Sequence, residues 1–332
     1  MNEKIVSVER VEDLIAVFGS FDENIRRIED ALSVNIVNRG NELKIVGEPE
    51  AVDKAVRTLE GLMQLAARGE IIMFVDSDDL LALDICARVA KEMRDYDLMI
   101  MNHQAFCSTE QIKDRLSGPA AHAQDLCSYS REDWVCSQLG SRRIIPKTLN
   151  LNTVWAKAYK RQFVEDYGIV FPEKILMGED MLFNLLVLLK EPKVCTLPVK
   201  ACFYRYNQTS IVHRYIADYH LRDSMFQKTL ADILHREEIA DHFVEALGYQ
   251  KLVGLLQTFS SDIFHRNNPK PEAEKKADFL TLVSREEYRN LVPGQLKYFS
   301  PEKQLALWFA RHQLYYPIKM MYLIKDRIRK LN

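Results

Sequence analysis

The feature that most constrains this chain is a run of five apolar residues, 71–75, that ends directly in Asp76-Ser77-Asp78-Asp79. A continuous apolar run of this length fits a strand that is buried on both faces. After the polar residues we expect Leu80, Leu81 and Leu83 to open a helix. A buried strand followed at once by a helix is typical of an α/β domain.

The three carboxylates that follow the run predict a metal site. Asp76, Asp78 and Asp79 offer hard oxygen ligands, which Mg²⁺ and Mn²⁺ prefer, and such ions keep positions open for diphosphate oxygens. The alternative is helix capping by Ser77 or Asp79. Capping needs only one of these acids, so the cluster favours the metal site.

Composition and missing motifs exclude several other classes of protein. The 332 residues suggest two or three domains, and 47% hydrophobic with 28% charged residues fit a soluble globular protein. No P-loop, GxSxG or HExxH motif occurs. The six cysteines contain no CxxC pair, so neither structural zinc nor a disulfide framework is expected, and reduced thiols favour a cytoplasmic location. No apolar run is long enough to cross a bilayer.

Charge divides the chain near residue 70. The first 70 residues hold nine basic and 14 acidic residues, a net charge of −5, whereas the remainder carries +3. Within this acidic part the pattern predicts a strand at 5–8, helices at 11–18 and 25–32, and a hairpin at 34–47. Pro49 then fits the first turn of a long helix. The order β-α-α-β-β-α indicates a small α+β unit.

This order, with a glycine between the first two helices, resembles a KH module. The run FGSFDENIRRIEDALSVNIVNRGNELKIVGEPEAV resembles, more specifically, the N-terminal domain of PhoH-family ATPases, over residues 5–68. A KH module clamps nucleic-acid backbone with a GXXG loop. Here Asp22 replaces the second glycine and Glu23 follows it. Phosphate contacts need basic residues, so we expect a folding or protein-contact module and no nucleic-acid binding.

The run RGEIIMFVDSDDLL resembles the central segment of family 2 glycosyltransferases, which have the GT-A fold. In that family a DxD motif holds the divalent cation that bridges the diphosphate of the sugar donor. The resemblance implies Mn²⁺ or Mg²⁺ as cofactor. It places the metal ligands at Asp76 and Asp78, with Asp79 as a close neighbour.

Two later motifs extend the resemblance. Trp155 and Lys157 match the "W-x-K-x-Y" segment on the acceptor side, and Glu179 and Asp180 match the "GED-x-x-F" motif at a helix start. The family implies Asp180 as the base that deprotonates the acceptor hydroxyl, oriented by Glu179. Inversion requires such a base opposite the leaving diphosphate. The alternative is favourable acidic charge at a helix N-terminus.

The stretch 202–212 resembles the family's "Y-x-Y-R-x-x-x-x-S-I" segment. Arg205 or His213 could reach a diphosphate, because cations stabilise its departing charge. For Tyr204 and Tyr206 we favour ordinary alternating strand positions.

The family's N-terminal strands, which bind the nucleotide base and ribose, have no counterpart here. Glycosyltransferase-like sequence begins at residues 68–70, where PhoH-like sequence stops. We therefore expect a fusion with a KH-like module at 1–69, a partial, Rossmann-like GT-A domain at 70–215 and a helical region at 216–332. A sheet without its first strands exposes an edge, so transferase activity should be impaired or absent.

The chain ends in a basic, aromatic segment at 308–332. From Arg311 onward six basic residues oppose Asp326, a net charge of +5. Such a segment indicates peripheral contact with the inner face of a membrane, or alternatively a helix packed on the domain with a solvated basic face.

The expected function is inverting transfer of a sugar from a nucleotide-diphosphate donor to a glycan, polysaccharide or lipid-linked acceptor, as in polysaccharide biosynthesis. The alternative is a non-catalytic protein that binds nucleic acid or protein through its KH-like module. The first is favoured because the DxDD and GED segments supply chemistry, whereas the KH-like loop lacks its glycine and cations.

Overall fold

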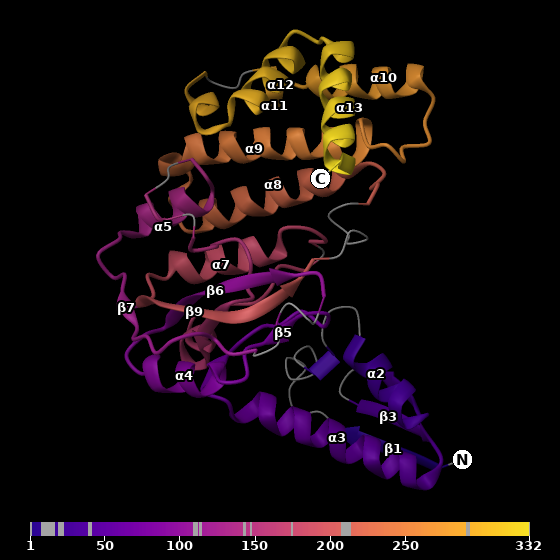
Figure 1. Ribbon diagram of the computed structural model, residues 1–332, viewed down its shortest axis with the longest axis vertical. Coiled ribbons are helices and arrows are strands. Elements are labelled where there is room, and N and C mark those ends of the chain that lie inside the picture. The colour runs from indigo at the N-terminus through magenta and orange to yellow at the C-terminus, as the bar shows by residue number, and fades with distance from the viewer. Residues whose placement is uncertain are drawn as a thin grey trace.

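The computed structural model describes the chain except residues 1, 8–16, 19–22, 39–41, 109–111, 113–114, 142–143, 147, 174, 207–213, 290–292 and 332. A small N-terminal unit, a central sheet with its helices and a group of C-terminal helices follow one another along the longest axis (Figure 1). The combination of mixed sheet and covering helices confirms the expected α/β class.

The N-terminal unit is a three-stranded antiparallel sheet covered by helices. Its described elements are β1 (Asn2–Ser7), α2 (Glu23–Leu32), β2 (Asn35–Asn38), β3 (Glu42–Gly47) and α3 (Pro49–Arg68). Leu43 and Ile45 alternate on β3 and are fully buried in one core with Val52 and Leu59 of α3. The predicted hairpin and the helix that begins at Pro49 are confirmed. The helix expected at 11–18 lies outside the described residues, except for 17–18.

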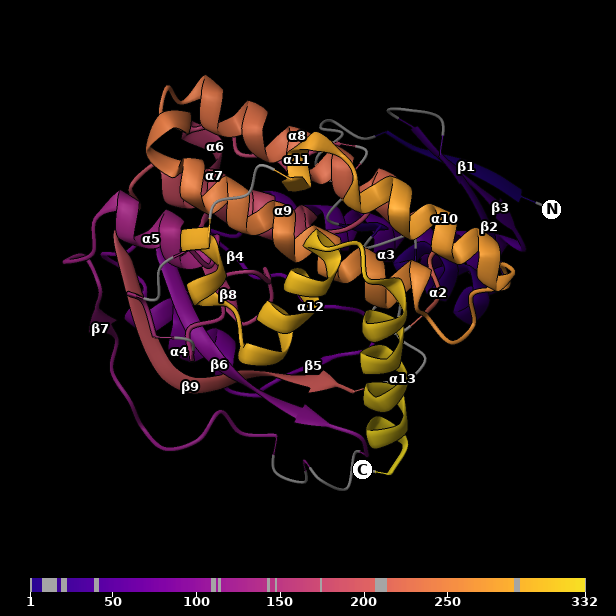
Figure 2. The same ribbon diagram turned by 90° about the horizontal axis from the view of Figure 1, so that it is seen from above.

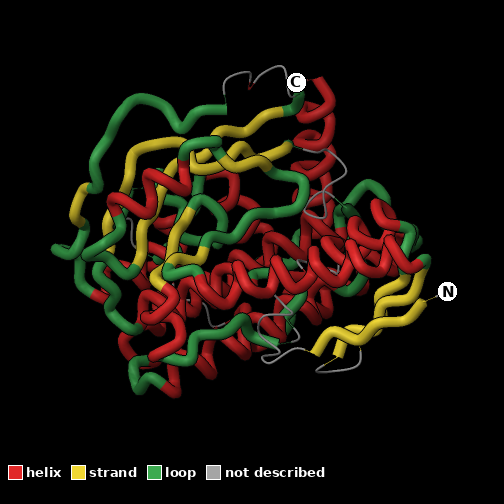
Figure 3. Tube along the Cα trace, turned by 90° about the horizontal axis from the view of Figure 1, so that it is seen from below, coloured by secondary structure: helices red, strands yellow, loops and turns green. Residues whose placement is uncertain are grey.

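The central sheet has the strand order β4-β8-β6-β9-β5, and β7 also pairs with β9. Its strands are β4 (Ile71–Ile72), β5 (Leu80–Leu81), β6 (Leu98–Phe106), β7 (Gln124–Asp125), β8 (Lys157–Lys160) and β9 (Val194–Arg205). β6 and β9 run parallel, whereas the other named pairs are antiparallel. Figure 3 separates this sheet from the strands beside the N-terminus.

Helices cover both faces of the sheet. Met99 and Met101 of β6 pack in one core with Ile85 of α4 (Ile85–Glu92). The alternate residues Leu98 and Ile100 belong to the opposite core, with α7 (Glu179–Leu189) and Trp134 of α5 (Arg131–Gln138). Because successive strand residues point to opposite faces, one strand serves both cores. Figure 1 shows α4 and α7 on the two sides of β6 and β9.

The prediction of a buried strand at 71–75 is wrong in its extent. β4 contains two residues, and Phe74 adds one isolated bridge to Trp155. Residues 71–74 are half-buried, and Val75 is 39% exposed. The physical reason is position: in the described part of the chain β4 pairs only with β8, so it lies at the edge of the sheet.

The prediction of a helix that opens at Leu80 is also wrong. Leu80 and Leu81 form β5 and pair with Phe203 and Cys202 of β9. Leu83 is 74% exposed, and α4 begins only at Ile85. A partner strand more than 120 residues away thus overrides the local helical pattern.

The C-terminal region is helical, as predicted, and the segment after β8 adds α6 (Arg161–Asp166). The C-terminal elements are α8 (Tyr219–Arg236), η4 (Ala240–Phe243), α9 (Val244–Thr258), η5 (Phe259–Ile263), α10 (Glu272–Val283), α11 (Glu286–Arg289), η6 (Pro293–Tyr298), α12 (Pro301–Arg311) and α13 (Tyr315–Leu331). Phe226 and Leu230 of α8 share a core with α7, and α9 to α13 build a separate core around Phe259 and Phe279. Figure 2 looks down on these helices above the sheet. None of the helices in the described ranges is long and apolar enough to cross a bilayer.

Candidate active site

The Asp76–Asp79 segment forms a tight turn between β4 and β5. The Asp79 N–H donates to the Asp76 carbonyl over 3.0 Å, and the Asp79 side chain is buried, with 7% exposure. Its Oδ1 accepts the backbone N–H of Arg205 over 2.7 Å. Its Oδ2 has no hydrogen-bond partner among the residues that the structure describes. The turn therefore presents a buried carboxylate oxygen that remains available to a ligand.

Arg205 ends β9 and lies against the same turn. Its Nε donates to the Asp78 carbonyl over 2.9 Å, and its guanidinium lies 4.7 Å from the centre of the Phe106 ring. Arg205 thus holds the turn to the sheet and places a cation beside the carboxylates.

The second acidic segment, Glu179-Asp180, begins α7. Gly178 precedes it with φ 86°, and a Cβ at this position would lie 2.7 Å from the ring of Phe226. Both facts require glycine, because other residues rarely adopt this conformation and no room exists for a side chain. Asp180 Oδ2 accepts the N–H of Val154 over 3.0 Å. Its carboxylate is therefore oriented by the loop that leads into β8.

The two acidic segments lie in one electrostatic field. Loss of hydration raises the pKa of Asp76, and the charges of Asp78 and Glu179 raise it further. Burial raises the pKa of Asp180 to about 6, with contributions from Glu179 and Asp76 that the Val154 hydrogen bond and Lys157 oppose. Burial also raises the pKa of Asp79 to about 6. We call Asp76, Asp78, Asp79, Glu179 and Asp180 the acidic site.

Lys157 faces the interior. Its side chain is 2% exposed, and its Nζ donates to the carbonyls of Asn150 and Thr153. Burial lowers the pKa of Lys157 to about 7, although Asp180 opposes this shift. This ammonium group therefore supports the loop beside Asp180 and does not face a space open to substrate.

A buried amide, Asn184, completes this support and was missed by the sequence reasoning. Asn184 lies one turn after Asp180 on α7, and its Nδ2 donates to the Thr153 carbonyl over 2.9 Å. Tyr159 donates its hydroxyl to Asn184 Oδ1 over 2.6 Å. The available signal was a polar residue four positions after Asp180 on an otherwise apolar helix.

Aromatic rings line the strand ends near the turn. Trp155 stacks on Tyr204 with 5.5 Å between ring centres, and the ring of His103 meets the Trp155 ring edge-on at 4.6 Å. Tyr204 lies on β9 and Tyr206 directly follows it, in accord with the strand interpretation. His103 was not anticipated, and burial lowers its pKa. His213 lies outside the described residues.

A full set of metal ligands is not preformed at the turn. Among described residues, only Asp218, His220 and Asp262 bring three potential ligand atoms within 4.8 Å of one another. Asp76, Asp78 and Asp79 thus offer separate carboxylates on one turn. Mg²⁺ in proteins is typically bound by one or two carboxylates together with substrate phosphates and water, and the turn is compatible with that arrangement.

Comparison with known proteins gives partial relationships. No family model matches the chain. EpsH of Bacillus subtilis, a protein named provisionally as a glycosyltransferase, is 26% identical over 213 residues, which cover 63% of this chain and 56% of EpsH. The chain thus spans little more than half the length of this relative. The similarity nevertheless extends over most of the chain.

A separate and shorter similarity involves PhoH-like proteins of Mycobacterium bovis and Mycobacterium tuberculosis. They are 32% identical over 96 residues, covering 24% of this chain and 27% of the relative. Two different sequence relationships therefore occur in one chain.

Among solved structures, S. aureus TarS 1-349 in complex with UDP-GlcNAc is similar with a TM-score of 0.46 at 15% identity, over 85% of this chain and 72% of TarS 1-349. Its complex with UDP gives 0.41 at 17% identity, over 81% of this chain and 70% of that one. A TM-score below 0.5 is too low to establish a common fold.

Proposed function

We propose that this chain is a family 2-type glycosyltransferase of the GT-A class that binds a nucleotide-diphosphate sugar and transfers the sugar, with inversion, to a glycan, polysaccharide or lipid-linked acceptor. The observation that carries the proposal is the electrostatic coupling of Asp76 with the carboxylates of α7, about 100 residues further along the chain. A donor-binding cluster and a candidate base are thereby brought to one place.

The proposed base is Asp180. An acceptor hydroxyl loses its proton to an ionised carboxylate, so the base must be deprotonated at the working pH. A pKa of about 6 leaves Asp180 largely ionised at neutral pH and still basic enough to accept a proton. The Val154 N–H holds one carboxylate oxygen, so the other is available to the acceptor. Glu179 keeps the local field negative.

The residues at the turn fit Mn²⁺ or Mg²⁺. Asp76, Asp78 and Asp79 would hold the ion, and the unpartnered Asp79 Oδ2 is a ligand atom of the required kind. The bound ion would neutralise charge on the donor diphosphate and its leaving group. Arg205 is proposed to act on the same charge, and Trp155 with Tyr204 to form an aromatic wall for donor or acceptor.

Lys157 and Asn184 are proposed to position Asp180. Both donate to the Thr153 carbonyl and so fix the loop whose next residue, Val154, binds Asp180. Buried polar groups of this kind are costly unless fully bonded, which makes the loop rigid.

We propose that activity is impaired because the half that binds the nucleotide base is missing and a PhoH-like module was fused in its place. Two features support this. β4 is short and lies at the sheet edge, where further strands would be expected to pair. In addition, Arg27 of α2 donates to the Ser77 carbonyl over 2.9 Å, so the N-terminal unit supports the DxDD turn by contact.

A transferase assay tests this proposal directly. The purified chain is incubated with pooled nucleotide sugars, Mn²⁺ and glycan acceptors, beside an intact family 2 enzyme. We expect transfer well below that of the intact enzyme. Multiple turnover at a comparable rate would contradict the impairment.

Membrane contact through residues 308–332 is also proposed. Trp308, Tyr316, Met320 and Ile324 are each at least half exposed on α12 and α13, beside basic residues. An amphipathic basic surface of this kind binds anionic lipid. Co-sedimentation with anionic vesicles at low salt is the test, and absence of binding there would eliminate the idea.

A further inference from the structure

A second group of ligating side chains lies in the C-terminal helices, away from the acidic site. Asp218 and His220 come from the start of α8, and Asp262 from η5, a π-helical turn. One ligand atom from each lies within 4.8 Å of the other two. At this spacing a single ion can reach all three at the usual bond lengths of about 2.0–2.2 Å.

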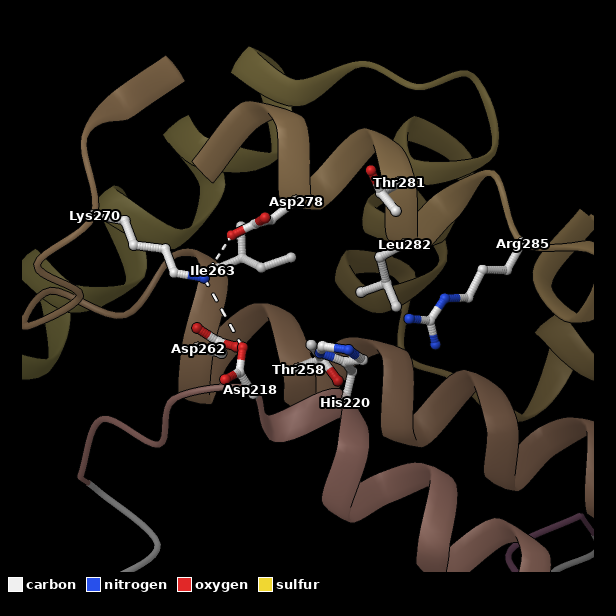
Figure 4. Close-up of a pocket in the computed structure, with 10 residues that line it drawn as sticks. All are labelled: Asp218, His220, Thr258, Asp262, Ile263, Lys270, Asp278, Thr281, Leu282 and Arg285. Atoms are coloured by element: carbon white, nitrogen blue, oxygen red, sulfur yellow. Dashed lines mark hydrogen bonds and ion pairs between the residues drawn. The ribbon is translucent and has the colours of Figure 1, made fainter. Parts of the chain in front are cut away.

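A cavity of about 200 Å³ adjoins these three residues (Figure 4). Its wall also includes Lys270, Asp278 and Arg285, and Thr258 and Thr281 add hydroxyl groups. A polar cavity of this size has room for water molecules, which can complete the coordination of an ion held by only three protein ligands.

The elements that carry the ligands are tied together before any ion binds. The Ile216 N–H donates to the Ser261 carbonyl over 2.9 Å, and the Tyr219 N–H donates to Asp262 Oδ2 over 3.3 Å. Asn268 Nδ2 donates to the Asp262 carbonyl over 3.0 Å. Hydrogen bonds of this kind orient metal ligands in proteins.

The buried carboxylate of Asp262 has only weak partners of its own. The side chain is 5% exposed, and its oxygens accept only two long printed hydrogen bonds, of 3.3 Å from Tyr219 and 3.5 Å from Asn268. A buried carboxylate normally requires stronger compensation. This site therefore has unused capacity for a cation.

Lys270 is the competing explanation, because its ammonium could serve as the cation. Its Nζ lies 2.8 Å from Asp278 Oδ2 but 3.9 Å from Asp218 Oδ1, as the dashed lines in Figure 4 show. Its short ion pair is thus with Asp278. Of the titratable groups on the wall, three carboxylates face two permanent cations, which leaves net negative charge beside His220.

We propose that Asp218, His220 and Asp262 form a second metal site, specific for a divalent transition-metal ion such as Zn²⁺. An imidazole nitrogen with two carboxylate oxygens suits Zn²⁺ better than Mg²⁺, which prefers oxygen ligands alone. The ion would clamp the start of α8 to η5 and expose one coordination position to the cavity. The absence of CxxC pairs does not bear on this site, because it uses no cysteine. We call it the helical site.

Calorimetric titration of the chelator-treated full chain with ZnCl₂ tests this proposal. The background is the Asp76→Asn/Asp78→Asn variant, so that the acidic site does not contribute. We expect one Zn²⁺ per chain, and affinity at least about 100-fold lower after His220→Asn or Asp262→Asn, beyond the loss typical of outer-sphere changes. Asp278→Asn is the matched control, because it lines the cavity without belonging to the ligand set, and should bind within about threefold of the background.

Two results would overturn the proposal: no Zn²⁺ bound by the background variant, or equal binding after His220→Asn and Asp262→Asn. If those variants fail to fold, the visible spectrum of Co²⁺ bound to the background variant decides. An intense spectrum typical of low coordination number, displaced by Zn²⁺, supports the site, whereas the weak spectrum of hydrated Co²⁺ contradicts it.

Discussion

The acidic site and the helical site both collect carboxylates, but they differ in how complete they are. In the helical site, three ligand atoms already lie within 4.8 Å of one another, and hydrogen bonds orient the segments that carry them. In the acidic site, Asp76, Asp78 and Asp79 share a turn without forming such a set. Instead, their charges raise the pKa values of neighbouring carboxylates.

This difference is informative about the use of each site. A site that must admit a substrate diphosphate leaves ligand positions to that substrate, so its protein carboxylates remain apart and poorly neutralised. A site that holds an ion for structural reasons gains from ligands that are already in place. The completeness of the ligand set thus separates a proposed substrate site from a proposed clamp.

The largest expected effect concerns the proposed base. Asp180→Asn removes proton acceptance and should reduce whatever transfer the wild-type chain retains by about 10²–10⁴-fold, the usual contribution of a general base. Product formed from labelled nucleotide sugar, quantified by mass spectrometry, is the measurement. Asp166→Asn on α6 is the control and should leave the rate unchanged. Equal rates for Asp180→Asn and wild type would eliminate Asp180 as base.

The next effect concerns a carboxylate that belongs to neither site. Burial raises the pKa of Asp223 on α8 to about 6, so its protonated form is favoured in the folded state. The stability that this adds is fully present below the unfolded pKa of 3.8 and is lost as pH rises through 6. Asp223→Asn should therefore stabilise the protein at pH 7.5, by at most about 3 kcal/mol, with little difference near pH 4.

Urea unfolding at several pH values measures this difference. Exposed Asp232→Asn on the same helix is the control and should show no such trend. A wild-type protein that is more stable than Asp223→Asn at pH 7.5 would show that this carboxylate is ionised and well paired in the fold.

The smallest effect concerns Lys157. Its positive charge lowers the pKa of Asp180, so Lys157→Met should raise that pKa above about 6. A carbon-detected NMR titration of the Asp180 carboxyl group measures this shift without any transferase activity. Lys160→Met, on the same strand, is the control. A lower or unchanged pKa in Lys157→Met would show that Lys157 has no influence on the proposed base.

Features set by neighbouring residues could be predicted from the sequence. The hairpin at 34–47 has a turn and alternating apolar residues, and Pro49 marks the start of α3. The Glu179-Asp180 pair at the start of α7 was also predicted correctly, because Gly178 and acidic residues are local signals of a helix start.

Features set by distant partners could not be predicted. Leu80 and Leu81 become a strand only because Phe203 and Cys202 lie beside them, and β4 stops at Ile72 because it is a sheet edge. The inward direction of Lys157 depends on carbonyls of a loop that has no motif. The helical site was missed for the same reason, since its ligands come from two segments about 40 residues apart.

The most direct test of the central claim is calorimetric binding of nucleotide sugars with and without Mn²⁺, for the wild type and Asp78→Ala. The account predicts weak binding by the wild type that requires Mn²⁺ and is lost in Asp78→Ala, because carboxylates on the turn hold the ion that contacts the diphosphate. Binding that does not need Mn²⁺, or that survives Asp78→Ala unchanged, would contradict it, as would the absence of binding to every nucleotide sugar with Mn²⁺ present.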